Sequence, residues 1–302
     1  MLSATHYMEM DKIKNPEQRG DVAGVMEELS GYASLVNRAT VMELELAAML
    51  DRFVTEPILE PEISLLGRGV RHSLGRGSGL KIFGPSGDVT GEVRTRMGAE
   101  QFDSMVDKAK FLLEQSVLRG PTADEVGELR ALGWQPQAAI RVAENRAIQE
   151  QGLTPHLDDE AKLRRGRLRD VIAARELSIE FQDMLPRALA RRGISLTDIF
   201  NGPESGRQFV RSMPSTEVSI ELKTTWHRDP GKSWTANDIY DIDAMALAVP
   251  YCDVVVADKA CHSALSAAHL GERMRTALLR NLEELPDVLD CWKSKRSQRL
   301  PA

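Results

Sequence analysis

The stretch that most restricts the fold is a short β-branched run, Val254-Val255-Val256, which follows a segment typical of a helix. An uninterrupted apolar run of this kind is typical of a strand buried on both faces, as in a parallel sheet. In the preceding residues 235–250, Thr235 or Asn237 can cap a helix and Pro250 can end it. The sequence therefore predicts a helix followed by a parallel strand, and with it an α/β fold.

Aspartates stand at both ends of this helix–strand segment. Asp238 and Asp241 are three residues apart, so they share a face near the helix start, while Asp243 points elsewhere. Asp258 follows the strand, at the edge where open α/β sheets bind ligands. Each aspartate alone has a simpler interpretation, as a helix-start acid or a solvated charge. As a set, they predict a Mg²⁺ or Mn²⁺ site that neutralises a phosphodiester and activates water.

These residues resemble the pattern of PIN-domain nucleases, which cut single-stranded RNA or DNA with Mg²⁺ or Mn²⁺ held by clustered carboxylates. The resemblance implies a helix-rich α/β, PIN-like three-layer fold with a short parallel central sheet. It also implies that Asp241 and Asp258 are metal ligands, with Asp238 as a further ligand or as a partner of the ligands. The matching residues are Asn237-Asp238-x-x-Asp241, Pro250-Tyr251-Cys252-Asp253, Val254-Val255-Val256 and Asp258.

A second match lies near the beginning of the chain. The run Ser3-Ala4-Thr5-His6-Tyr7-Met8-Glu9 resembles the place where PIN domains carry their metal-site glutamate, which makes Glu9 a candidate metal ligand. By itself Glu9 would be read as a surface charge. PIN domains usually begin with a strand ending in Asp, and no such segment precedes Glu9. Either translation starts upstream, or the protein is a catalytically weak PIN-like module for RNA binding or protein interaction.

The remainder of the chain is predicted to be largely helical. The domain organisation that we expect is a PIN-like domain formed by residues 1–59 and 209–302, interrupted by a helical insertion at 60–208. Apolar spacing predicts helices at 16–36 and 39–54, with Glu43 and Glu45 on the solvated face of the second. Residues 99–193 are predicted to be mostly helical. After Pro214, the spacing of Val218 and Leu222 fits a helix or a strand.

Two basic segments fall within the predicted insertion. Residues 67–98 are rich in Gly and Arg, and they are expected to form a long mobile loop, or alternatively a basic loop that touches RNA phosphates. The arginine run at 164–169 is typical of a solvated helix face, and an RNA-facing role is the alternative. His227 is expected to be a loop histidine without a role.

Composition narrows the class of protein. The net charge of −6 argues against a simple nucleic-acid coat protein, and less against a nuclease with acidic metal ligands. Three cysteines, an odd number without C-x-x-C spacing, predict buried free thiols in a reducing cytoplasm. No window approaches the roughly 18 apolar residues of a membrane span. We therefore expect a cytoplasmic protein without membrane contact.

Together, these features predict a metal-dependent endoribonuclease that hydrolyses single-stranded RNA. By resemblance it would be the toxin of a toxin–antitoxin pair, with an antitoxin protein and homo-oligomers as further expected partners. The expected site residues are Asp241, Asp258, Asp238 and Glu9, and the expected cofactor is Mg²⁺ or Mn²⁺.

Overall fold

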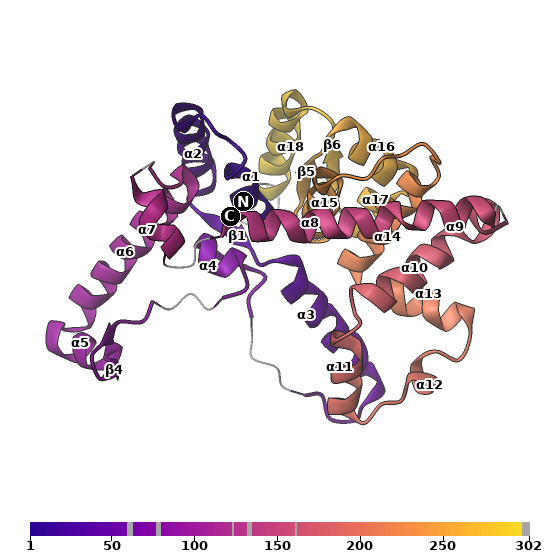
Figure 1. Cartoon of the computed structure of the whole chain (residues 1–302), viewed down its shortest axis with the longest axis horizontal. Helices are drawn as coiled ribbons and strands as arrows, with labels where there is room; N and C mark the ends of the chain where they lie inside the picture. Colours follow the sequence, from indigo (N-terminus) through magenta and orange to yellow (C-terminus); the bar gives the residue numbers. More distant parts are fainter. Residues whose placement is uncertain (59–62, 77–79, 123, 132–134, 161, 298–302) are drawn as a thin grey trace. The chain divides into compact units, whose positions relative to one another are not determined.

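The computed structural model describes residues 1–58, 63–76, 80–122, 124–131, 135–160 and 162–297. Over these residues the protein is helix-rich, with short strands in small sheets, one of which is a parallel pair (Figure 1). The chain divides into two compact units, residues 1–40 with 61–142 and residues 41–60 with 143–302. The predicted boundary between the nuclease domain and the insertion, at residues 59 and 60, falls outside the described residues. The assignment of a nuclease domain and an insertion stays a prediction. None of the described helices combines the length and apolar character needed to cross a membrane.

The first unit is built around a small sheet and two long helices. Strand β1 pairs antiparallel with β2, and Leu2 adds a parallel bridge to Ser34. Its core includes Leu2, Tyr7 and Leu118. The elements are α1 (Ala4–Met10), α2 (Pro16–Ser30), β1 (Ala33–Leu35), β2 (Leu66–Arg68), α4 (Gly69–Ser73), β3 (Phe83–Gly84), β4 (Gly87–Asp88), α5 (Thr90–Met97), α6 (Ala99–Arg119) and α7 (Glu125–Ala131).

Two predictions for the first unit were wrong. The helix expected at 16–36 ends at Ser30, because Gly31 adopts a left-handed φ of 50° that caps it, and β1 follows. The segment at 67–98 is not one long loop, since it contains β2, α4, the β3–β4 hairpin and α5. These elements are too short to produce a periodic apolar pattern, and so they left no signal in the sequence. Residues 77–79 of this segment lie outside the described residues.

The second unit is mostly helical and carries the parallel strand pair. It contains most of α3 (Arg38–Leu50) and α8 (Pro136–Gln151). The helix predicted at 39–54 is confirmed, and the described residues of 99–193 are mostly helical, as predicted. The remaining elements are η1 (Asp51–Phe53), α9 (Leu153–Asp159), η2 (Leu163–Arg167), α10 (Leu168–Ile179), α11 (Met184–Arg192), α12 (Leu196–Ile199), α13 (Pro203–Arg211), α14 (Pro214–His227), α15 (Ala236–Tyr251), β5 (Val254–Val256), α16 (Lys259–Ala267), α17 (Leu270–Met274), β6 (Ala277–Leu279), η3 (Leu282–Glu284) and α18 (Leu285–Ser297).

Helix α14 is the centre of this unit and packs along α15. Val218, Ile220 and Leu222 are all fully buried, at 0% exposure. Because the helix is covered on several sides, its apolar residues do not follow a single stripe, which explains why helix and strand fitted the sequence equally well. The helical alternative is the correct one.

Glu45 contradicts the expected solvated face of α3, whereas Glu43 is exposed as predicted. Glu45 is only 7% exposed, and its carboxylate accepts hydrogen bonds from the backbone N–H (2.7 Å) and hydroxyl (2.6 Å) of Ser215 and from the Tyr251 hydroxyl. Ser215 lies in the first turn of α14, where backbone N–H groups favour a carboxylate. These bonds join α3 to the start of α14 and the end of α15.

His227 is buried and part of the arginine run is half-buried, neither of which the sequence predicted. His227 ends α14 at 2% exposure, and its Nε2 lies 3.0 Å from a Glu150 carboxylate oxygen. Arg164 donates to the His227 carbonyl, and Arg169 donates to Glu217 at 2.6 Å. These two arginines therefore pair within the protein rather than forming a solvated face. Arg169 of α10 meets an opposite charge on α14, whereas Arg164 of η2 bonds to the backbone at the end of α14.

The predicted strand is present and parallel, but it is less buried than expected. Val254, Val255 and Val256 pair in register with Ala277, Leu278 and Leu279 of β6. Val255 is buried, whereas Val256 is 36% exposed. The strand is thus covered mainly on one face, and its carboxyl end leads into α16.

Candidate metal centre

The first side of the site is the opening turn of α15, and a capping box fixes it. Thr235 is the N-cap residue, and the Asp238 carboxylate accepts from its backbone N–H at 2.7 Å and from its hydroxyl at 2.8 Å. The other Asp238 oxygen accepts from the ammonium group of Lys232. Asp241 comes three residues later on the same side of the helix and is half-buried. The cap thus sets the position from which Asp241 projects.

The second side comes from the carboxyl end of β5. Asp258 is the N-cap of α16, and its Oδ1 accepts the backbone N–H of Cys261 at 2.7 Å. This bond fixes the carboxylate and leaves lone pairs on both oxygens for another partner. Asp258 is exposed, whereas Cys261 is only 2% exposed. The geometry follows from the sequence order of a parallel strand, an N-cap residue and a helix.

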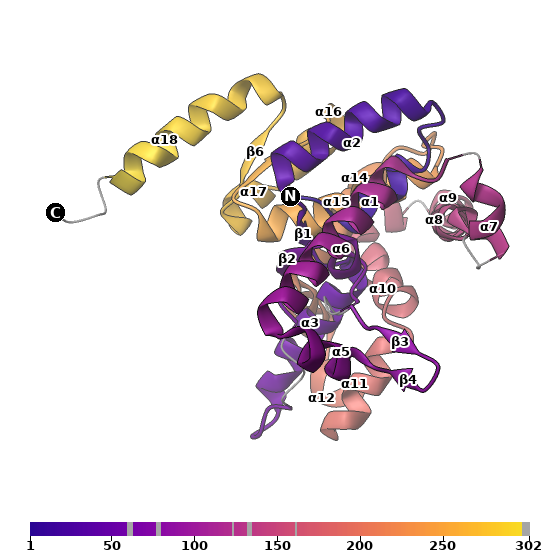
Figure 2. The same ribbon diagram turned by 90° about the vertical axis from the view of Figure 1, so that its left-hand side faces the viewer.

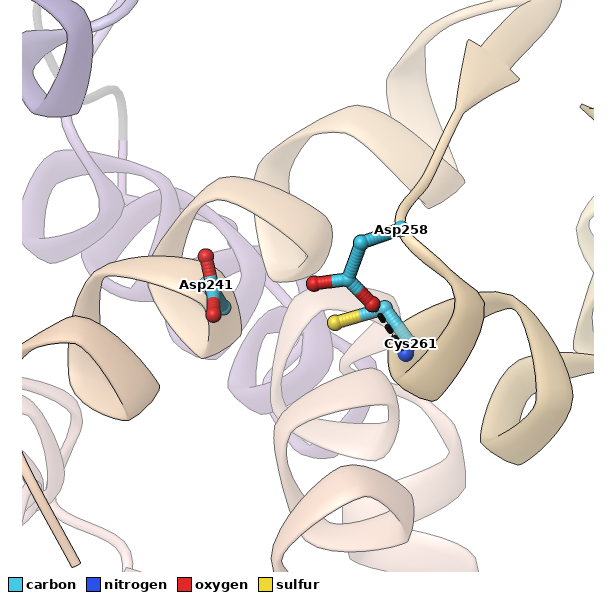
Figure 3. Close-up of side chains that lie close together, drawn as sticks. All are labelled: Asp241, Asp258 and Cys261. Carbon is cyan, nitrogen blue, oxygen red and sulfur yellow. Dashed lines mark hydrogen bonds between the residues drawn. The ribbon is translucent and has the colours of Figure 1, made fainter. Parts of the chain in front are cut away.

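Three side chains converge between these two sides. Single ligand atoms of Asp241, Asp258 and Cys261 all lie within 4.8 Å of one another. Figure 3 shows Asp258 and Cys261 on one turn of chain and Asp241 facing them from α15. This group brings together the two aspartates that the resemblance named as metal ligands. It also adds a cysteine that sequence reasoning treated only as a buried thiol.

The electrostatics of the group favour a cation. Burial raises the pKa of the Cys261 thiol well above its ordinary value, and the negative charges of Asp258 and Asp241 raise it further. Two carboxylates and a neutral thiol therefore face one another, and a divalent ion would offset their charge.

The oxygen and sulfur atoms of this group suit a divalent ion that binds both kinds of ligand. The two carboxylates are the hard oxygen donors that Mg²⁺ and Mn²⁺ prefer. A cysteine sulfur, which loses its proton when it binds a metal, is a poor ligand for Mg²⁺ and a better one for softer first-row ions. Three protein donors leave room for water or substrate oxygens around the ion.

The remaining predicted site residues lie outside this group. Both oxygens of Asp238 already accept hydrogen bonds, so the structure gives it a capping role, and its part as a ligand stays a prediction. Glu9 is exposed on α1 in the first unit, and its role also stays a prediction. Asp243 points away, as expected, and its carboxylate accepts from Arg146 at 2.7 and 3.0 Å.

Cys261 is the site residue that the sequence analysis missed. The available signal was its position three residues after Asp258, because an N-cap side chain reaches the N–H group of the third helical residue. Comparisons with known proteins add no relative, since no family model, curated protein or solved structure matches this chain.

Proposed function

We propose that this protein is a metal-dependent phosphodiesterase that cuts single-stranded RNA, with its centre at Asp241, Asp258 and Cys261. The observation that carries the proposal is the convergence of these three donors at the carboxyl end of a parallel strand. Ligand sites in α/β sheets form at that edge. The resemblance of residues 237–258 to PIN domains gives the substrate class.

The protein's own residues would hold the ion and position it. Asp241 and Asp258 provide negative charge from two separate elements, and the N-cap bond of Asp258 keeps its carboxylate in place. A divalent ion held there supplies positive charge against the phosphodiester and makes water more acidic. The chain's charge of −6 is compatible with a hydrolytic site of this kind, because acidic metal ligands add negative charge that a bound cation offsets locally.

Two exposed cationic residues follow the carboxyl ends of the paired strands β5 and β6. Arg280 follows β6, whose last residue, Leu279, accepts a hydrogen bond from Ala257 N–H at 2.9 Å. Arg280 therefore lies at the same edge of the strand pair as Asp258, and it is exposed. Lys259 is exposed directly after Asp258. Both can hold phosphate oxygens while Asp241 and Asp258 hold the ion.

The test is cleavage of a labelled single-stranded RNA by the full chain with Mn²⁺ or Mg²⁺. We expect cutting that depends on the ion, and a loss of at least about 100-fold for Asp241→Asn, because removing a charged group that stabilises the transition state costs several kcal/mol. Isothermal titration should show weaker Mn²⁺ binding by the same variant.

The matched control is Asp253→Asn. Asp253 is exposed just before β5 and lies outside the donor group, so the variant should cut RNA like the wild type. Ion binding without any cleavage would favour the alternative of a catalytically weak RNA-binding or interaction module. If neither ion binding nor cleavage occurs in a folded sample, the proposed centre is wrong.

A further inference from the structure

The first unit carries an exposed aromatic side chain on a short hairpin. Strand β3 pairs with β4 through Phe83↔Asp88 and Gly84↔Gly87, and the hairpin lies beside α5 in both views (Figures 1 and 2). Phe83 is 70% exposed, compared with 49% for Phe53 and 43% for Phe111. An aromatic ring held in water forgoes a burial worth roughly 2 kcal/mol. Its exposure therefore leaves the ring available to a partner.

Hydrogen bonds at its base fix the hairpin, so the exposure of Phe83 does not come from a frayed loop. Ile82 N–H donates to the Thr90 hydroxyl at 2.8 Å, and that hydroxyl donates to Asp88 at 2.6 Å. Val89 N–H donates to the Ile82 carbonyl at 2.9 Å. Hydrogen bonds from Thr90 lower the Asp88 pKa to about 2, which keeps this carboxylate ionised and the base closed near neutral pH.

The stretch of sequence that carries Phe83 is basic rather than apolar. Residues 67–98 contain six Lys or Arg and two Asp or Glu, which gives this segment a charge of +4 (6 − 2) in a chain of −6. Lys81 is two residues before Phe83, and its side chain is 67% exposed although it lies 3.2 Å from Asp88. Arg96 is exposed on α5, the helix that begins at Thr90. An apolar protein partner would call for further exposed apolar side chains beside Phe83.

We propose that the β3–β4 hairpin is a docking surface for single-stranded RNA, in which a base stacks on Phe83 and phosphates contact Lys81 and Arg96. Single strands present base faces next to phosphates, and an aromatic ring among cations matches both groups. In a duplex the base faces are stacked on one another, so the ring selects a single strand. This inference rests on the proposed function, which identifies the bound nucleic acid as single-stranded RNA. It assigns the first unit a role in binding that RNA.

The test is fluorescence anisotropy with a labelled single-stranded RNA of about 12 nucleotides, with the full chain carrying Asp241→Asn so that the RNA stays intact. Phe83→Ala should weaken binding by roughly 5- to 100-fold, the range that loss of one base–aromatic stack produces. Phe83→Trp should restore it. Lys81→Ala and Arg96→Ala should each weaken binding and flatten its dependence on salt, because each removes one phosphate contact.

Phe53→Ala is the matched control, since Phe53 is an exposed phenylalanine outside the basic segment, and it should bind as the parent does. Binding that is unchanged in Phe83→Ala, or equally tight binding of duplex RNA, would overturn the inference. The two proposals fail separately. If the wild type never cuts RNA but Phe83→Ala weakens binding, only the proposed nuclease activity is wrong. If the wild type cuts RNA but Phe83→Ala binds it unchanged, only the docking surface is wrong.

Discussion

At the residue scale, the proposed metal centre predicts a role for the Cys261 thiol in the choice of ion. It is 2% exposed and stands among the donor atoms of Asp241 and Asp258. Cys261→Ser replaces a soft donor with a hard one of nearly the same shape. We expect the ratio of Mn²⁺ to Mg²⁺ affinity to fall by roughly tenfold, because thiol ligation favours the softer ion. Isothermal titration of both ions with both proteins measures this ratio.

Cys252→Ser provides the control for that substitution. Cys252 is half-buried just before β5, and it is not part of the donor group. Its variant should keep the wild-type ratio of affinities. If Cys261→Ser also keeps the wild-type ratio of Mn²⁺ to Mg²⁺ affinity, then the thiol only packs beside the two carboxylates and does not bind the ion.

At the element scale, α4 depends on a glycine at its first residue. Gly69 has φ +86°, and a Cβ there would lie 2.3 Å from a Glu114 carboxylate oxygen. That carboxylate accepts the Val70 N–H at 2.8 Å and the Tyr7 hydroxyl at 2.9 Å, so it cannot move without losing both. We expect Gly69→Ala to lower the free energy of unfolding by about 2 kcal/mol or more, through the strained φ and the displaced carboxylate.

The comparison is Gly91→Ala in α5. A Cβ at Gly91 meets nothing within 4 Å, and its φ is not in the left-handed region. This variant should be as stable as the wild type or up to roughly 1 kcal/mol more stable, because alanine favours the helix. Urea unfolding followed by circular dichroism measures both variants. If both variants lose the same free energy of unfolding, then the close approach of Gly69 to Glu114 does not explain why α4 begins with glycine.

The elements near the site were predictable because their signals are local. Thr235 marks the start of a helix and the valine run marks a strand, both from neighbouring residues alone, and the strand then puts Asp258 opposite Asp241. The predicted helix end at Pro250 was wrong, because α15 continues through this proline to Tyr251. The burial of Glu45 could not be predicted, because its partner Ser215 lies 170 residues away. His227 likewise depends on Glu150, at a separation of 77 residues. A polar residue in a helix looks solvated until its distant partner is known.

At the scale of the whole molecule, the second unit is held together by charges as well as by apolar packing. Lys223 is 3% exposed, and its ammonium lies 2.8 Å from Glu150 and 2.6 Å from Glu176. His227, which is on α14 like Lys223, hydrogen-bonds to Glu150, and Arg175 lies 3.6 Å from the Glu150 carboxylate. These groups join α8, α10 and α14 in one buried network. Removing one charge leaves the others without compensation, which is costly in a buried site.

This network predicts how stability depends on pH. Burial alone would raise the pKa of Glu150, but hydrogen bonds from His227 and Lys223 outweigh it and lower the pKa from 4.5 to about 2. The unfolded chain therefore binds the proton first as the pH falls. The stabilisation from Glu150 is complete above the unfolded pKa of 4.5 and is lost as the pH falls toward 2. Its size is on the order of 3 kcal/mol, from the relation between a pKa difference and stability.

Glu150→Gln separates this contribution from that of the other carboxylates. The variant should lose on the order of 3 kcal/mol at pH 7, and its free energy of unfolding should fall less steeply between pH 5 and pH 3 than that of the wild type. Urea titrations at pH 7, 5, 4 and 3 measure both effects. Glu144→Gln, an exposed substitution on the same helix, should follow the wild-type curve. If Glu150→Gln keeps the full wild-type slope, then acid acts on other carboxylates, and the network does not couple the second unit to pH.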